Sequence, residues 1–208
     1  MRTNAYIDGF NLYHSILPFN EPRLKWLNLR SLCENFLQKG DKLNEVYFFS
    51  AYLTHNQDKF SRHLNYTKAL QSVSVTPIMG KFKKKFPHCK NCNTDYQTYE
   101  EKQSDINIAI TLLRDAFLDK FDKAFLITAD TDLVSTIKMI KELFPKKRII
   151  LLIPPKRRKY ANELIQTANA NFEIKKTDLL NSLLPDTIYL KNEAIKIPNE
   201  YIKEQNDR

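Results

Sequence analysis

Acidic residues recur in three short motifs that are widely separated along the chain. Asp8 lies in AYIDGFNL, Asp105 lies in YEEKQSDINIA, and Asp130 and Asp132 lie in FLITADTDL. Each motif follows an apolar, strand-like run or begins a helix-like one. Carboxylates gathered in one pocket repel each other unless a divalent cation neutralises them. The formal net charge of the chain is +9, so such a pocket indicates metal-dependent chemistry on a polyanion.

Each acidic motif also has a purely structural explanation. Asp8 followed by glycine is a common turn pair. Asp130 or Thr131 would cap the helix that follows, and Asp105 in a first helical turn suits the helix dipole without any metal. Together the motifs favour a site, because three independent caps and turns need not converge on one edge of a fold.

Apolar segments alternate with segments of helix length and so predict the elements that position these residues. The expected strands are Asn4–Ile7, Glu45–Leu53, Val73–Met79, Lys123–Thr128, Arg148–Ile153 and Asn171–Lys175. The expected helices are Leu29–Leu37, Lys59–Leu70, Asp105–Leu118, Leu133–Leu143, Ala161–Ala168 and Asp178–Leu184. Strands that are apolar throughout indicate a three-layer, doubly wound, mainly parallel α/β fold. Ligands bind at the carboxyl ends of such strands, and this edge would gather the acidic motifs.

Local signals refine two of these elements. Pro77 suggests that its strand is an edge or that it ends there. Ser104 is a good N-cap for the helix beginning at Asp105, and Glu101 would share a face with Asp105 if that helix began early. Four apolar residues of this helix fall on one stripe, namely Ile106, Ile110, Leu113 and Phe117.

The motifs and their order resemble those of NYN-domain proteins, PIN-like ribonucleases that include the LabA-like group. The matching pieces are YIDGFNLYHS, EEKQSDINIAI and FLITADTDLVSTIK, and the resemblance covers roughly Thr3 to Leu184. It implies a PIN-like fold and cleavage of RNA with a divalent metal, Mg²⁺ or Mn²⁺. The metal-binding carboxylates that it implies are Asp8, Asp105, Asp130 and Asp132.

The resemblance also implies roles for neighbouring residues. Asn11 matches the asparagine of the DGFN motif, which would orient Asp8 or contact the scissile phosphate. Thr128 stands where a hydroxyl would hydrogen-bond to a ligand carboxylate. Glu101 and Lys102 lie in the EEKQSD motif, and Lys102 would pair with a pocket carboxylate or a phosphate. The TAD turn departs from the Ser-Gly-Asp-like turn of many relatives, and alanine is less permissive there than glycine.

Two basic clusters follow predicted strands. KFKKKF spans 81–86 and PPKRRKY spans 154–160, and in a parallel sheet the second lies on the carboxylate edge. Cationic side chains suit phosphates, and aromatic rings stack on unpaired bases, although a charge run is ordinarily a solvated loop. The candidate RNA-binding residues are Lys83, Lys84, Lys156, Arg157, Arg158 and Tyr160.

The three cysteines are too few and of the wrong parity for a disulfide framework. Cys89 and Cys92 have the CxxC spacing of a zinc knuckle, but a second pair is missing. The remaining ligands of a structural Zn²⁺ would come from a second subunit in a homodimer or from this chain, which offers His88, Cys33, His55 and His63. Reduced structural thiols are the alternative.

Composition bounds the remaining expectations. The 208 residues are 42% hydrophobic and 27% charged, as in a soluble globular protein. No apolar run approaches the roughly 20 residues of a membrane span, and the N-terminus lacks the apolar stretch of a signal peptide, so we expect a cytoplasmic protein without a membrane partner. We expect an NYN domain over 1–184, with 81–99 as a hairpin or zinc-knuckle insertion, and a tail over 185–208 that docks on it.

A metal-dependent ribonuclease is therefore the leading functional hypothesis. One rival is a non-catalytic RNA-binding or regulatory module, which would have little reason to gather carboxylates near phosphate. The other rival is a metal-dependent phosphatase or nucleotide hydrolase with a similar pocket. The chain has no P-loop, GxGxxG, GxSxG or HExxH motif.

Overall fold

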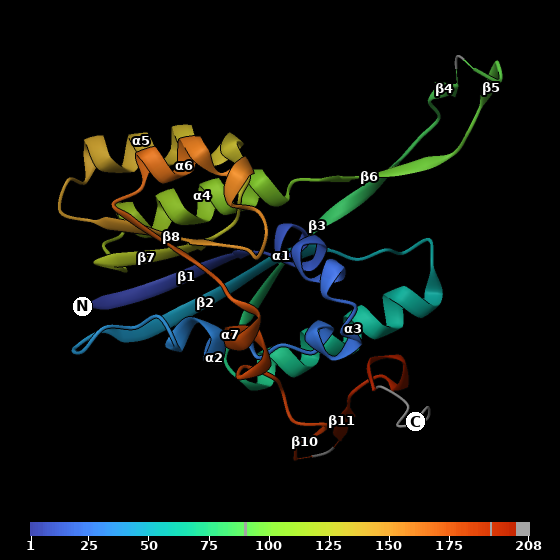
Figure 1. Ribbon diagram of the computed structural model, residues 1–208, viewed down its shortest axis with the longest axis horizontal. Coiled ribbons are helices and arrows are strands. Elements are labelled where there is room, and N and C mark those ends of the chain that lie inside the picture. The colour runs from blue at the N-terminus through green and yellow to red at the C-terminus, as the bar shows by residue number, and fades with distance from the viewer. Residues whose placement is uncertain (90, 192, 203–208) are drawn as a thin grey trace.

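The computed structural model describes residues 1–89, 91–191 and 193–202 of the chain. The strands of its central sheet are β1 (Arg2–Asp8), β2 (Lys42–Ala51), β3 (Thr76–Lys85), β6 (Thr98–Lys102), β7 (Lys123–Ile127), β8 (Arg148–Ile153) and β9 (Ala170–Glu173). They lie in the order β6-β3-β2-β1-β7-β8-β9 (Figure 1). All neighbouring strands pair in parallel except β3 and β6, which pair antiparallel.

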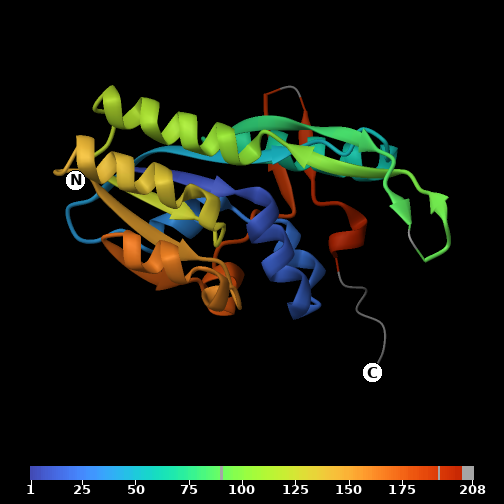
Figure 2. The same cartoon turned by 90° about the horizontal axis from the view of Figure 1, so that it is seen from above.

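Helices cover both faces of this sheet. On one face lie α4 (Ser104–Phe117), α5 (Val134–Leu143) and α6 (Asn162–Thr167), side by side in Figure 2. The opposite layer comprises α1 (Gly9–Ile16), α2 (Leu29–Glu34), α3 (Gln57–Ser72) and α7 (Lys176–Leu180). Successive residues of a strand point to opposite faces of the sheet and pack in two separate cores. Ile7 packs on the face covered by α1, α2, α3 and α7, and Tyr6 packs on the face covered by α4, α5 and α6. The expected three-layer, mainly parallel α/β fold is confirmed.

The strand predicted at 73–79 is longer than expected. It begins at Thr76 and continues through the basic run to Lys85, because residues 81–85 find hydrogen-bonding partners on β6. Pro77 is its second residue, and β3 pairs with β6 only from Lys81 onward. Pro77 therefore lies where β3 has no partner on the β6 side, so its missing N–H removes no hydrogen bond to β6.

Two expectations for α4 are wrong. Ser104 is the first helical residue, and the N-cap position belongs to Gln103, at φ 85°. Three residues of the predicted stripe face solvent, since Ile106 is 61%, Ile110 59% and Phe117 77% exposed, and only Leu113 packs partly against the core. The helix instead buries a different set against the sheet, which includes Ile108, Leu112 and Ala116.

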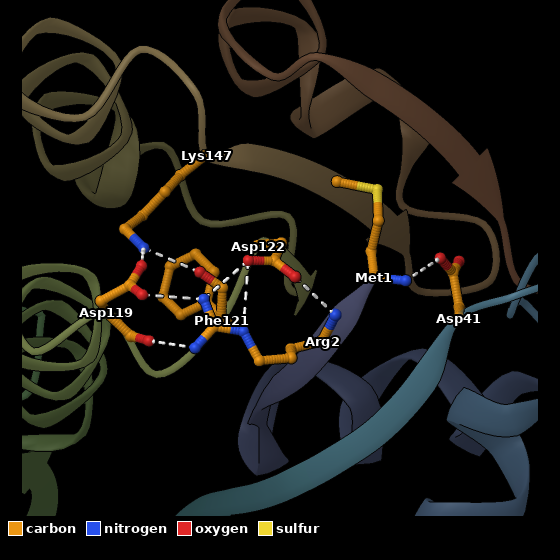
Figure 3. Close-up of polar contacts among 7 residues, drawn as sticks. All are labelled: Met1, Arg2, Asp41, Asp119, Phe121, Asp122 and Lys147. Atoms are coloured by element: carbon orange, nitrogen blue, oxygen red, sulfur yellow. Dashed lines mark hydrogen bonds and ion pairs between the residues drawn. The ribbon is translucent and has the colours of Figure 1, made fainter.

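The amino-terminal edge of the sheet is held by ion pairs (Figure 3). Arg2, which begins β1, contacts Asp122 Oδ1 at 2.7 Å and Asp119 Oδ2 at 2.9 Å. Lys147 Nζ also reaches Asp119, at 2.7 Å. Hydrogen bonds from Arg2 lower the pKa of Asp122 to about 2. Basic partners thus neutralise the acidic side chains at this edge.

Beyond α7 the described part of the chain packs against the second helical layer. A hairpin of β10 (Thr187–Tyr189) and β11 (Ala194–Lys196) buries Ile195 beside Trp26. Trp26 Nε1 donates to Pro185 O at 3.0 Å. The tail prediction for 203–208 lies outside the described residues. Within the described ranges, no helix is long and apolar enough to cross a bilayer.

The segment predicted as an excursion is a twisted ribbon. β3 and β6 leave the body of the domain together, and the two-residue strands β4 (His88–Cys89) and β5 (Thr94–Asp95) continue it outward (Figure 1). We call the paired part of β3 and β6, over 81–85 and 98–102, the ribbon.

Candidate functional site

The site lies where the order of the sheet reverses. β1 is flanked by β2 and β7, and the chain builds outward from β1 in both directions. In doubly wound sheets a crevice forms at the carboxyl ends of the two strands at this point. Asp8 ends β1, and Thr128 directly follows β7, whose Ile127 pairs with Ile7. The two side chains are therefore neighbours.

Asp8 is held by two hydrogen bonds. Thr128 Oγ1 donates to Asp8 Oδ2 at 2.9 Å, and the backbone N–H of Asn11 donates to Asp8 Oδ1 at 2.9 Å. The second bond caps α1, whose N-cap is Asp8. Only 4% of Asp8 is exposed. Burial raises the pKa of Asp8, and the two hydrogen bonds oppose this rise by stabilising the carboxylate.

The loop after β7 is ordered by its own polar groups and by Asn11. Asn11 Oδ1 accepts from the backbone N–H of Ala129 at 3.2 Å. The N–H of Asp130 donates to Thr128 Oγ1 at 3.1 Å, and the N–H of Asp132 donates to Asp130 Oδ1 at 3.0 Å. The Asn11 side chain therefore ties the loop after β1 to the loop after β7.

Glu101 reaches the site from β6, and α4 does not begin early enough for Glu101 and Asp105 to share a helical face. Glu101 Oε1 accepts from both the N–H and the Oγ of Ser104, at 3.1 Å and 2.6 Å. It thereby supplies the acceptor that the start of α4 needs. Asp105 follows in the first turn of the same helix.

Gly80 permits this arrangement. A Cβ atom on Gly80 would lie 2.5 Å from the backbone oxygen of Lys102 and 3.1 Å from Glu101 Oε1. Only a residue without a side chain allows β6 to approach so closely. The chain has only three glycines. A glycine directly before the basic run was therefore a signal of this close approach, and the sequence analysis did not use it.

The carboxylates of the site are close enough for their charges to affect the pKa of Asp105. The pKa of Asp105 is raised to about 6, first by burial and then by repulsion from four other carboxylates. In decreasing order of effect these are Asp130, Asp8, Glu101 and Asp132. The Lys102 side chain pairs with Glu100 at 2.8 Å, which lies outside this set.

An all-oxygen donor set fits Mg²⁺ or Mn²⁺. Among the described residues, no three His, Cys, Asp or Glu side chains are arranged to hold one ion together. Magnesium usually takes only one or two protein carboxylates and fills its octahedron with waters and substrate phosphates. Burial raises the pKa of Asp105 most, and repulsion from the neighbouring carboxylates, which a cation would relieve, raises it further. The residues present therefore fit such an ion.

The basic loop after β8 lies at the same edge of the sheet. β8 runs parallel to β7, so its carboxyl end and the turn Arg158–Tyr160 face the same way as Asp8. Lys156 Nζ lies 4.8 Å from the ring centroid of Phe19, and Arg158 donates to Asn171 Oδ1 at 3.1 Å. Lys156, Arg158 and Tyr160 remain exposed.

The two candidate lysines of the ribbon lie on opposite faces. Cross-strand partners share a face, and successive residues alternate. Lys84 pairs with Tyr99 and therefore shares a face with Glu101, whereas Lys83 pairs with Glu100 on the other face.

The proposed zinc ligands have other partners where they are described. Cys92 Sγ lies 3.0 Å from Thr94 Oγ1, and His88 Nδ1 lies 2.9 Å from Asp95 Oδ1. The side chain of Cys89 lies outside the described residues, so the zinc prediction remains open. The suggested additional ligands lie on or near other elements, with Cys33 in α2, His55 before α3 and His63 within α3.

Three comparisons bear on these observations. A family model, the NYN domain, matches residues 2–175, which confirms the expected resemblance. A curated relative from Pseudomonas putida, 6-hydroxy-3-succinoylpyridine 3-monooxygenase HspA, is 26% identical over 239 residues, covering 97% of this chain and 76% of that protein. A crystal structure of a protein of unknown function from Vibrio parahaemolyticus matches with TM-score 0.56 and 13% identity, over 88% of this chain and 96% of that one. The structural match supports the fold alone.

Proposed function

The chain belongs to the NYN-domain family, and from this premise we propose that it is a metal-dependent ribonuclease that hydrolyses phosphodiester bonds in RNA. The observation that carries the proposal is the set of carboxylates at the switch point of a basic protein. Burial and mutual repulsion raise the pKa of Asp105 to about 6. Such a cluster is unfavourable for binding phosphate unless a cation accompanies it.

The ion would be held by carboxylates drawn from Asp8, Asp105, Asp130 and Asp132. When bound, Mg²⁺ or Mn²⁺ supplies Lewis acidity, which neutralises charge on the phosphate and activates water for attack. The chain's own residues prepare this site. Thr128 and the Asn11 N–H each donate to one oxygen of Asp8 and so fix the orientation of its carboxyl group. Glu101 fixes the start of α4, and with it the position of Asp105.

Substrate positioning would fall to the loop after β8. Lys156, Arg157 and Arg158 carry cationic groups at the carboxyl edge of the sheet, where guanidinium forks suit phosphate oxygens. Replacing all three by alanine should weaken RNA binding and reduce the slope of log affinity against log salt by up to about 2. An unchanged slope would contradict this role.

The central test uses charge-removing substitutions of similar size. Asp8→Asn and Asp130→Asn should abolish RNA cleavage in Mg²⁺ or Mn²⁺ while circular dichroism and thermal unfolding remain those of a folded protein. Glu142→Gln, which neutralises an exposed carboxylate on α5, is the matched control and should cleave normally. Undiminished cleavage by both aspartate variants would refute the proposal.

Substrate comparison separates the rival functions. RNA, single-stranded DNA and mononucleotides should be assayed side by side with Mg²⁺, Mn²⁺ and EDTA. Cleavage of RNA that EDTA abolishes supports the proposal. RNA binding without cleavage would favour a non-catalytic module, and release of phosphate from nucleotides alone would favour a phosphatase. The monooxygenase activity named for the Pseudomonas relative is a separate chemistry, and 26% identity does not carry it to this chain.

A further inference from the structure

One face of the ribbon continues outward from the carboxylate cluster. Gly80, Phe82 and Lys84 alternate along β3, so they share a face, and their cross-strand neighbours there include Glu101 and Tyr99. Glu101 lies at the acidic site, because its Oε1 accepts hydrogen bonds from the N–H and the Oγ of Ser104, the residue before Asp105. The face therefore has a carboxylate at its base and leads away from the domain body (Figure 1).

Aromatic rings line the middle of this face. The Phe82 ring lies 5.8 Å from that of Phe10 and 5.9 Å from that of His55, both nearly perpendicular to it. His55 stacks on Tyr99 with centroids 3.6 Å apart and planes 2° apart. His55 is exposed to solvent at the surface of this group of rings. Rings from α1, from the loop before α3 and from the ribbon thus converge on one surface without belonging to either main core.

The outer part of the face is cationic. Lys84 Nζ lies 4.9 Å above the ring centroid of Phe86, which is 63% exposed. The opposite face differs, since Lys85 there forms an ion pair with Glu100. Lys84 has no ion-pair partner among the described residues and is therefore available to an anion, whereas Lys85 and Lys102 share the carboxylate of Glu100 on the opposite face.

We propose that this face of the ribbon binds single-stranded RNA, which extends from the carboxylate cluster across His55 and Phe82 to Lys84 and Phe86. This proposal rests on the proposed ribonuclease function and names its substrate class. Exposed rings stack only on bases that are unpaired, and a neighbouring cation follows the phosphates. A duplex keeps its bases stacked inside and would offer the rings nothing to contact.

The dimensions set the length of strand involved. Six residue steps separate Gly80 from Phe86, which at about 3.3 Å per residue is about 20 Å. At about 3.4 Å per stacked nucleotide this path accommodates at most about six nucleotides beyond the site. Affinity should therefore rise with the length of the single strand and then level off.

Binding in EDTA tests the proposal without any cleavage. The probe is a fluorescent, unstructured RNA of graded length, compared with a blunt RNA duplex of the same length. His55→Ala and Phe86→Ala should each weaken single-strand binding by about five-fold or more and remove the gain with length. Tyr189→Ala removes an aromatic ring that is 83% exposed on β10, so it is the matched control and should bind like the wild type.

Two adjacent lysines test the facial assignment. Lys84→Ala should reduce the slope of log affinity against log salt by about 0.7, the value for one phosphate contact on a single strand. Lys85→Ala removes the same charge one residue away on the opposite face and should leave the slope unchanged. Equal losses in the two lysine variants would overturn the proposal. So would unchanged affinity in both aromatic variants, or duplex binding as tight as single-strand binding.

A substrate without bases separates this proposal from the ribonuclease assignment. Hydrolysis of bis(p-nitrophenyl) phosphate with Mn²⁺ should be lost in Asp8→Asn and retained in His55→Ala and Phe86→Ala. Retention by Asp8→Asn would count against the carboxylate chemistry, while the binding series would still decide the role of the ribbon. Loss of this hydrolysis in the aromatic variants would show that they act on the site itself and would overturn the binding role.

Discussion

Thr128→Val should separate the hydroxyl of Thr128 from its packing. Thr128 is fully buried, donates to Asp8 Oδ2 and accepts from the N–H of Asp130. Valine has nearly the same shape but neither donates nor accepts. Thr128→Ser is the matched control, because serine keeps both hydrogen bonds and loses only a methyl group.

The structure sets the expected magnitudes. A hydrogen bond to a charged group contributes about 1.5–3 kcal/mol, and leaving the part-buried N–H of Asp130 without a partner costs about 1 kcal/mol more. The added apolar methyl of valine offsets about 0.8 kcal/mol. We therefore expect Thr128→Val to lower the free energy of unfolding by about 2–3 kcal/mol. Thr128→Ser should lower it by about 1 kcal/mol, the value of one buried methyl.

Urea unfolding at pH 8 in EDTA measures these differences without metal. A second readout is the pKa of Asp8, followed by carbon NMR of its carboxyl group. The hydrogen bond from Thr128 opposes the rise that burial causes, so the pKa of Asp8 should rise further in Thr128→Val and remain near the wild-type value in Thr128→Ser. RNA cleavage should fall in the same order.

Equal stability of the two variants would refute this reasoning. It would mean that the hydroxyl contributes no more than a methyl group. A pKa of Asp8 that is unchanged in Thr128→Val would refute the electrostatic part separately, because the carboxylate would then not depend on this donor.

Three further predictions concern other parts of the molecule. Gly80→Ala drives a Cβ to within 2.5 Å of the Lys102 oxygen, so cleavage should fall by about ten-fold or more as the site shifts; a normal kcat would show that β6 can move freely. Burial lowers the pKa of His63 to about 4 in the folded protein, against about 6.5 in the unfolded chain. As the pH falls from 6.5 towards 4, His63 is therefore protonated in the unfolded chain before it is protonated in the folded protein, and stability is lost. Between pH 7.5 and 5 the loss is about 2 kcal/mol, and urea titrations of His63→Leu should lack this share of it; an unchanged pH dependence would contradict the assignment. Asp122→Asn should lower the melting temperature, more at low salt than at high salt, while kcat for RNA stays at the wild-type value because the Arg2 pair lies at the opposite edge; a lost activity would contradict this separation.

Hydrophobicity along the chain was sufficient to predict where the carboxylates meet. Asp8 and Asp130 follow strands that are apolar throughout, and the ends of parallel strands share an edge. The contacts that orient them were beyond such reasoning. The bond between Thr128 and Asp8 depends on the pairing of Ile7 with Ile127, a register that neither local segment encodes.

The buried face of α4 was mispredicted for a specific reason. Apolar residues occur on both sides of the helix, so periodicity alone does not identify the inner side. The buried side also includes Asp115, whose Oδ2 accepts a hydrogen bond from Tyr6 at 2.9 Å. A carboxylate there makes the inner face less hydrophobic by composition than the outer one. Only tertiary partners reveal that it is satisfied.

Helix α1, which the sequence analysis did not predict, and the ribbon both depend on contacts that local hydrophobic patterns do not reveal. α1 has eight residues, begins at Gly9 and owes its first turn to the Asp8 cap, so its signal is weak on any window of helical periodicity. The basic run after Met79 lacks the apolar character of a strand. It extends because β6 pairs with it, although the paired residues Lys81 and Lys102 are 21 positions apart in the sequence.

Glu101 is covalently part of the ribbon and electrostatically part of the carboxylate cluster. Its bonds to Ser104 also fasten the ribbon to the helix that carries Asp105. One end of the ribbon therefore lies at the carboxylate cluster, and its outer end extends away from the domain body. A ligand that bends the outer end of the ribbon and thereby moves Glu101 would change the spacing of the carboxylates and hence their affinity for a cation. Thermodynamic reciprocity then requires the cation to change the affinity for that ligand by the same factor.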